Sequence, residues 1–110
     1  MLGRTGRMAL FAAARRTGRP GPMPLNLTVS VTRRCDSHCT TCGIWCSGQD
    51  PSEELEVREL ERLFASIGPG SVYFLNISGG EPTLREDLPA IVEKGLEHLR
   101  PSHVHLPVNG

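Results

Sequence analysis

Strand-like and helix-like patterns alternate along residues 25–108, and this order limits the possible folds more than any other feature of the sequence. Residues 25–32 alternate apolar and polar side chains, and a period of two indicates a strand. Helical and strand patterns then follow in turn, at 51–67, 72–77, 87–99 and 103–108. A strand–helix–strand–helix–strand order predicts three parallel strands joined by two right-handed crossover helices.

Local signals predict where the two helices begin. Asp50, Pro51 and Glu53 place an acceptor at the N-cap, a proline at the first helical position and a glutamate at the third. Asp87 is the expected N-cap of the second helix. The faces expected to be buried carry Val57, Leu60, Leu63, Phe64 and Ile67 in the first helix, and Leu88, Ile91, Val92, Leu96 and Leu99 in the second.

The first and third predicted strands are polar on one face. That face carries Asn26, Thr28, Ser30, Thr32, His103 and His105. A sheet covered by helices on both sides would need strands that are apolar throughout. We therefore expect an α/β fold, a partial (β/α) TIM-like barrel whose polar face lines a reaction chamber.

The first 24 residues differ in charge from the rest of the chain. They hold five arginines and no acid, whereas residues 25–110 hold seven basic and twelve acidic side chains. The apolar run at 8–14 is far shorter than the roughly 18 residues of a membrane span, and arginines rather than a cleavage site follow it. We interpret residues 1–24 as a basic leader and linker with a short surface helix, Met8–Arg16, although an organellar transit peptide has the same Arg-rich profile.

The formal net charge of zero gives no evidence for a nucleic acid or membrane partner. Because no secretory signal is evident, we expect a cytoplasmic protein whose cysteines stay reduced. All four cysteines lie within twelve residues, Cys35 to Cys46, in the loop after the first predicted strand. Clustered thiols in a reducing compartment indicate a metal site.

The cysteine spacing leaves three kinds of site open. Cys35, Cys39 and Cys42 form C-x3-C-x2-C, and three thiolates would leave one iron of a 4Fe–4S cluster free to bind another molecule. If Cys46 is a fourth ligand, the cluster is an electron-transfer centre. A zinc-binding module is the third alternative.

A second group of chemistry-bearing residues, Ser78-Gly79-Gly80-Glu81-Pro82, follows the second predicted strand. The two glycines let the backbone approach a ligand closely, and Glu81 offers a carboxylate to a cationic group. In a barrel, this segment and the cysteine loop lie at the carboxyl ends of adjacent strands, on the face that carries chemistry.

These motifs resemble those of the radical S-adenosylmethionine (radical SAM) enzymes. The segment CDSHCTTC matches the cluster motif of that family, GGEP matches its second signature, and Val108-Asn109-Gly110 is similar to the turn that often closes its third strand. The resemblance covers residues 25–110 and implies a core of six strand–helix units, of which this chain holds half. We therefore expect residues 25–110 to be the N-terminal half of a radical SAM core domain, a fragment that alone lacks substrate turnover.

The resemblance also implies a role for individual residues. Cys35, Cys39 and Cys42 would ligate three irons of a 4Fe–4S cluster, and the fourth iron would bind S-adenosylmethionine (SAM). An electron from a low-potential donor would cleave SAM to methionine and a 5′-deoxyadenosyl radical, which abstracts hydrogen from a substrate that the motifs do not identify. Cys46 is expected not to be a ligand.

The same resemblance assigns the cofactor contacts. Gly79 and Gly80 would pass along the methionine part of SAM, and Glu81 would hold its ammonium group. Thr41 stands where many members have an aromatic residue beside the adenine, so only its backbone contact with SAM is expected to survive.

Two further groups are interpreted as structural. The acidic run from Glu53 to Glu61 is predicted to be the solvated face of a helix. His98 lies within a predicted helix where no carboxylate completes a metal motif, so a second metal site is not expected there.

Overall fold

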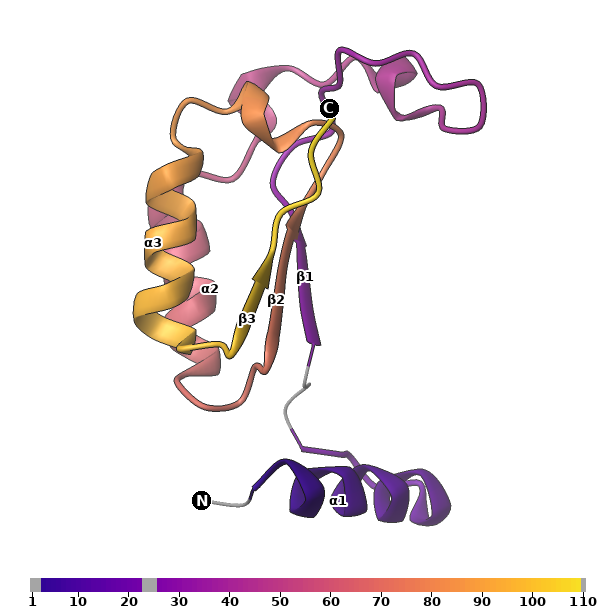
Figure 1. The fold of residues 1–110 in the computed structure, drawn as a ribbon, viewed down its shortest axis with the longest axis vertical. Helices are drawn as coiled ribbons and strands as arrows, with labels where there is room; N and C mark the ends of the chain where they lie inside the picture. Colours follow the sequence, from indigo (N-terminus) through magenta and orange to yellow (C-terminus); the bar gives the residue numbers. More distant parts are fainter. Residues whose placement is uncertain (1–2, 23–25, 110) are drawn as a thin grey trace.

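The computed structural model describes residues 3–22 and 26–109. Its helices and strands follow the order α1 Arg4–Thr17, β1 Asn26–Ser30, α2 Val57–Ile67, β2 Phe74–Ser78, α3 Leu88–Leu99 and β3 His103–His105. The three strands form one parallel sheet in the order β1-β2-β3 (Figure 1). This confirms the predicted α/β fold, with three parallel strands and two crossover helices.

Helices α2 and α3 lie together on one face of the sheet (Figure 1). The fully buried side chains between these layers come from β2, α2 and α3, and they include Leu75, Ile77, Phe64, Ile91 and Leu99. A side chain at Gly95 of α3 would meet Leu75 Cδ2 at 2.7 Å, so glycine lets α3 pack closely on the central strand. The helices thus fix the sheet from one side.

The opposite face of the sheet is polar except for Phe74 of β2, and α2 and α3 leave it uncovered. Asn26, Thr28 and Ser30 of β1 and both histidines of β3 are exposed, as the alternating pattern predicts. His105 Nδ1 lies 3.0 Å from Asn76 Oδ1 on the neighbouring strand. Thr32 is the exception, because it lies beyond the end of β1 and is only 2% exposed.

The start of α2 differs from the prediction. Asp50 caps a short 3-10 turn, Pro51–Glu53, by accepting a hydrogen bond from the Ser52 amide at 2.8 Å. The α-helix begins only at Val57, because Glu56 and Glu59 form a reciprocal capping box there. Two capping signals six residues apart therefore split the predicted helix into a turn and a helix.

Some predicted boundaries and buried positions are also wrong. Helix α1 extends beyond the predicted Met8–Arg16 at both ends, and β3 stops at His105 rather than at residue 108. Leu63 and Leu96 were expected in the core but are exposed by 41% and 47%. Each lies at the edge of its helix's apolar face, where the three-stranded sheet offers no partner.

Helix α1 lies at the amino ends of the strands (Figure 1). Arg7 Nη1 donates to the carbonyls of Gly70 and Ser71, at 2.9 and 2.5 Å, in the connection that leads into β2. None of the helices in the described part of the chain is long and apolar enough to cross a membrane.

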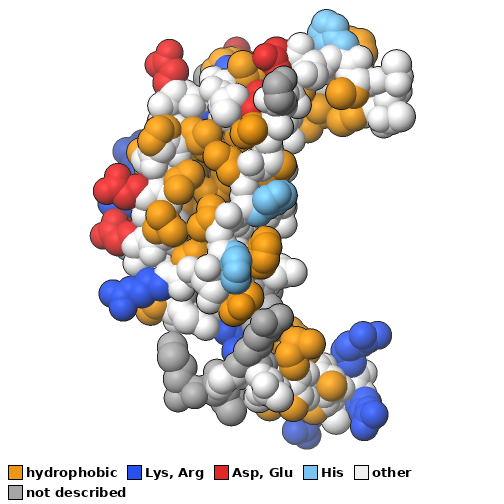
Figure 2. All heavy atoms as spheres, viewed as in Figure 1, with side chains coloured by type: hydrophobic (Ala, Val, Ile, Leu, Met, Phe, Trp, Pro, Cys, Tyr) orange, Lys and Arg blue, Asp and Glu red, His pale blue; other side chains and the backbone are white. Residues whose placement is uncertain are grey.

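Apolar side chains gather on the surface over α3 and β3 in Figure 2. Those exposed in this region include Leu96, Val104 and Val108. Strand β3 pairs only with β2 among the described strands, so its other backbone edge carries no ladder partner there. The cysteine loop and the segment Gly79–Glu81 follow β1 and β2 at the carboxyl end of the sheet.

Candidate cluster and cofactor site

The cysteine loop leaves the carboxyl end of β1 and extends to one side of the sheet, in purple and magenta at the top of Figure 1. All four cysteines have free thiols; Cys35 is half-buried, and the other three are exposed. None of residues 35–53 is buried, so apolar packing does not hold this loop.

Polar and aromatic contacts shape the outer part of the loop. Trp45 Nε1 donates to the Cys39 carbonyl at 3.4 Å, and its ring lies 4.5 Å from that of His38. Backbone bonds from Cys42 to Cys39 and from Cys46 to Gly43 form consecutive turns. Trp45 therefore packs on the loop itself, beside Cys39.

The thiol spacing bears on the kind of metal site. Zinc–sulfur bonds of about 2.3 Å bring all ligand atoms of a zinc ion close together. Among the described residues, the cysteines do not form a group of three or more ligand atoms that all lie within 4.8 Å of one another. Four free thiols, three exposed and one half-buried, on a loop without a core are a donor set that suits a cluster with ligands on separate irons.

The Gly79–Glu81 turn follows β2 and is joined to the base of the cysteine loop by backbone hydrogen bonds. The Gly80 amide donates to the Thr32 carbonyl, and the Glu81 amide donates to the Arg34 carbonyl, each at 2.8 Å. The pairing of β1 with β2 thus continues past both strand ends. The residue before Cys35 is held directly against the turn.

The two glycines are required by this close approach. A Cβ atom at Gly79 would lie 2.4 Å from the Thr32 carbonyl oxygen, and one at Gly80 would lie 2.2 Å from that of Arg34. The sequence predicted a close backbone approach at these glycines, with a ligand as the neighbour. In the structure, the neighbour is the base of the cysteine loop.

Glu81 is buried, and its carboxylate faces the end of the chain segment that follows β3. One oxygen accepts from the amide and hydroxyl of Thr83, and the other accepts from the Asn109 amide at 2.6 Å. The Thr83 hydroxyl and the Asn109 amide hold the pKa of Glu81 below its ordinary value. The carboxylate is therefore ionised at neutral pH, with three of its roughly four lone-pair positions occupied.

Asn109 connects Glu81 to the cysteine loop. Its side-chain amide donates to Cys35 Sγ at 3.6 Å and to Asp36 Oδ1 at 3.3 Å, while its backbone amide donates to Glu81. The structure thus brings Cys35, Gly79, Gly80 and Glu81 to one place. Thr41 lies exposed in the outer loop between Cys39 and Cys42.

The prediction that the acidic run from Glu53 to Glu61 is a solvated face is wrong at Glu54, whose side chain is buried. Its side chain is only 6% exposed and accepts hydrogen bonds from Arg34 at 2.7 and 3.2 Å and from the Thr32 hydroxyl. Arg85 Nε also lies 3.8 Å from Glu54 Oε2. The partners come from segments 20 and more residues away, so no local pattern reveals them.

Two carboxylates of this region have lowered pKa values. Burial alone would raise the pKa of Glu54. The hydrogen bonds from Arg34 and Thr32 and the charges of Arg34 and Arg85 together outweigh burial, so the pKa of Glu54 lies below its ordinary value. Arg85 likewise lowers the pKa of Asp87, to which it donates two bonds. Such groups stabilise the fold above their unfolded pKa values of about 4, and this stabilisation is lost as the pH falls through the folded values.

We expect the free energy of unfolding to stay level from pH 7 to about pH 5 and to fall steadily below about pH 4.5. Urea unfolding at a series of pH values measures this. In the Asp87→Asn variant, the fall should be shallower, because one depressed carboxyl is gone. An equal slope in both proteins would contradict the assignment of Asp87.

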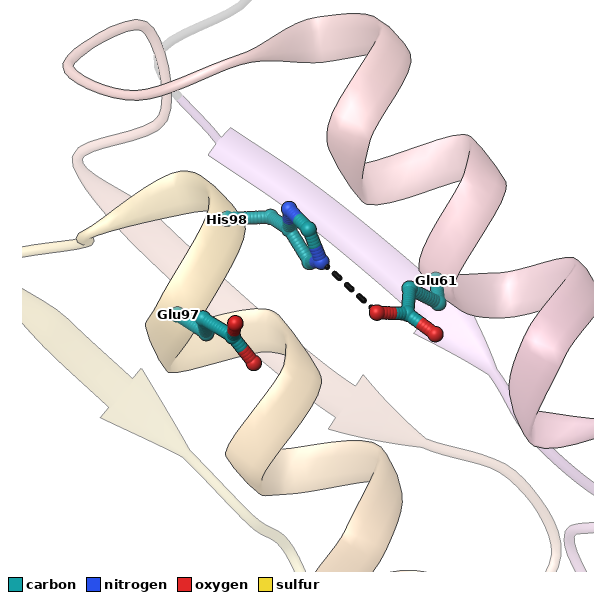
Figure 3. A group of neighbouring side chains, drawn as sticks. All are labelled: Glu61, Glu97 and His98. Carbon is teal, nitrogen blue, oxygen red and sulfur yellow. Dashed lines mark hydrogen bonds and ion pairs between the residues drawn. The ribbon is translucent and has the colours of Figure 1, made fainter.

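A separate group of titratable side chains lies between α2 and α3 (Figure 3). Ligand atoms of Glu61, Glu97 and His98 lie within 4.8 Å of one another, and His98 Nε2 is 3.0 Å from Glu61. The sequence motifs did not indicate that two carboxylates lie beside His98, because Glu61 belongs to the other helix. Lys94 Nζ already supplies a positive charge there, 3.0 Å from Glu61 and 3.3 Å from Glu97.

Comparison with known proteins identifies a family. A model of the radical SAM superfamily matches residues 29–110. Similar curated proteins include a GTP 3′,8-cyclase of Vibrio atlanticus, which is 39% identical over 69 residues that are 60% of this chain and 21% of the relative. A mycofactocin maturase MftC of Mycobacterium ulcerans is 32% identical over 75 residues, which are 68% of this chain and 20% of the relative.

A PqqA peptide cyclase of Methylobacterium nodulans is also similar, at 33% identity over 67 residues, which are 61% of this chain and 18% of the relative. The chain thus spans about a fifth of the length of these relatives. No solved structure matches it.

Proposed function

The chain belongs to the radical SAM superfamily, and on this premise we propose that it binds a 4Fe–4S cluster through Cys35, Cys39 and Cys42, with SAM at the remaining iron. Membership implies SAM-dependent radical chemistry with an iron–sulfur cluster, and the similar curated proteins are radical SAM enzymes. The observation that carries the proposal is the junction at the carboxyl end of the sheet. There Asn109 contacts both Cys35 and Glu81.

The thiolates are the part of this chain that would hold the cluster. Cys39 and Cys42 are exposed, and Cys35 is half-buried beside Asn109, so a cluster can reach all three sulfurs from solvent. When bound, the cluster and SAM would supply a 5′-deoxyadenosyl radical through one-electron reductive cleavage of SAM, with methionine as the other product. A low-potential electron donor is a partner that this function requires.

The residues after β2 would orient SAM. The ionised Glu81 carboxylate keeps one acceptor position beyond its bonds to Thr83 and Asn109, and an ammonium group would fill it. The backbone of Gly79 and Gly80 would line the methionine part, and the backbone of Thr41 would contact the adenine. The uncovered polar face of the sheet would form one wall of the chamber beside them.

We also propose how the chain divides. Residues 25–110 would form the first three strand–helix units of the core domain, with the site at their carboxyl ends. Residues 1–24 would form a separate basic segment, which Arg7 fastens to the opposite end of the sheet through the carbonyls of Gly70 and Ser71.

Replacing Glu81 by glutamine tests the cofactor assignment. We expect the dissociation constant for SAM to rise about 10-fold to 100-fold, because a charge-assisted hydrogen bond is lost, while iron and sulfide content stay the same. Calorimetric titration of the reconstituted protein with SAM measures this. Glu93→Gln, an exposed position on α3, is the matched control. Equal SAM affinity in both variants would remove Glu81 from the site.

A further inference from the structure

The base of the cysteine loop is closed by a buried carboxylate. Arg34 directly precedes Cys35, and Glu54 lies just after the last turn of the loop, Pro51–Glu53. Arg34 Nε and Nη2 reach the two oxygens of Glu54 at 2.7 and 3.2 Å. This bidentate pair joins the two ends of a loop whose cysteines themselves have no buried packing.

Arg85, which follows the Gly79–Glu81 turn, is the second arginine beside Glu54. Its Nε atom lies 3.8 Å from Glu54 Oε2, and its side chain is 4% exposed. Its Nη1 atom donates to the carbonyls of Val31 at 2.9 Å and Leu55 at 3.0 Å, one on each side of the cysteine loop. Its other nitrogens bind Asp87 at 2.8 and 2.7 Å.

The backbone of Arg34 links this network to the cofactor residues. The Arg34 carbonyl accepts from the Glu81 amide, and the next residue is Cys35. A rotation of the Arg34 backbone would therefore move Cys35 and break the Glu81 amide bond together. The Arg34 side chain opposes that rotation through Glu54.

We propose that Glu54 is a positioning residue that holds Arg34 at the base of the cysteine loop and thereby sets the place of Cys35 relative to Glu81. This inference rests on the proposed function, because it assigns Glu54 a role toward the cluster that Cys35 would help to hold. Closing a flexible loop at its base also lowers the entropy that the loop loses when it wraps a cluster.

The test compares Glu54→Gln and Arg34→Gln in the full product of the gene, after anaerobic iron–sulfide reconstitution. We expect each variant to lose its cluster to a ferrous chelator about tenfold faster than the unmodified protein, because a tenfold change corresponds to the loss of about one charge-assisted bond. We also expect each to bind SAM more weakly. Because both variants remove the same charge pair, the double variant should lose its cluster no faster than Glu54→Gln alone.

Glu61→Gln is the matched control. Glu61 is an ion-paired glutamate on α2, but its partners His98 and Lys94 belong to α3 and lie apart from the loop. We expect it to change stability while leaving cluster lifetime and SAM affinity unchanged. If Glu54 has only a structural role, Glu54→Gln will also lower Tm and leave the cluster lifetime of the folded protein unchanged. That result would overturn the inference.

Two further outcomes are distinguishable. If Glu54→Gln does not fold, Arg34→Gln decides, because the Arg34 side chain is 27% exposed and its loss leaves Glu54 paired with Arg85. Normal cluster lifetime in that variant overturns the inference. If the unmodified protein takes up no iron, the proposed function itself fails.

Discussion

We expect that changing Cys35, Cys39 and Cys42 together to alanine will abolish iron and sulfide uptake during anaerobic reconstitution, whereas Cys46→Ala will leave both unchanged. The expected loss is complete because thiolates are the ligands that hold iron–sulfur clusters in proteins, and removal of three leaves one thiol in the loop. Iron and acid-labile sulfide analysis, together with the visible absorbance of the brown protein, measures this result.

Cys46→Ala is the informative control, since Cys46 is as exposed and as free as Cys39 and Cys42. If it abolishes the cluster as fully as a change at Cys39, four thiolates hold the iron and an electron-transfer centre replaces the SAM site. If the protein instead binds zinc in equal amount and takes up no iron, neither kind of cluster is present.

We expect Gly80→Ala to lower the free energy of unfolding by about 3 kcal/mol or more, the upper part of the range for overpacking. The added Cβ would lie 2.2 Å from the Arg34 carbonyl oxygen and 2.7 Å from its carbon. These are backbone atoms held by the Glu81 amide and next to Cys35, so they cannot move aside as a side-chain end could. The new methyl group must separate the loop base from the turn.

Thermal unfolding of the metal-free protein measures this effect, with about 4–8 °C of Tm expected for each kcal/mol in a domain of this size. Gly43→Ala is the matched control, because a Cβ at Gly43 meets nothing within 4 Å and its φ is −94°. We expect that variant to stay within about 0.5 kcal/mol of the unmodified protein. Equal Tm values for the two variants would contradict the close packing of the loop base on the turn.

The fold was predictable where a local pattern and the tertiary structure agree. The period of two in residues 25–32 predicted both the strand and its uncovered polar face. The start of α2 was not predictable in the same way, because Asp50 and Glu56 both carry valid capping signals. Only the tertiary structure decides which signal begins the longer helix.

The candidate site was predictable as two motifs at the carboxyl ends of neighbouring strands, and the structure places Cys35 and Glu81 beside one residue, Asn109. Glu54 was missed because its sequence neighbours suggest a charged surface, whereas its contacts are made across the loop to Arg34 and across the sheet end to Arg85. Charge pairs that join distant segments leave no periodic signal in a single sequence.

Electron paramagnetic resonance of the anaerobically reconstituted and chemically reduced protein, recorded before and after SAM is added, tests the central claim most directly. We predict the signal of a one-electron-reduced 4Fe–4S cluster whose g values shift when SAM binds, because one iron has no cysteine ligand. A cluster signal that SAM leaves unchanged, or the absence of any cluster, would contradict the proposed function.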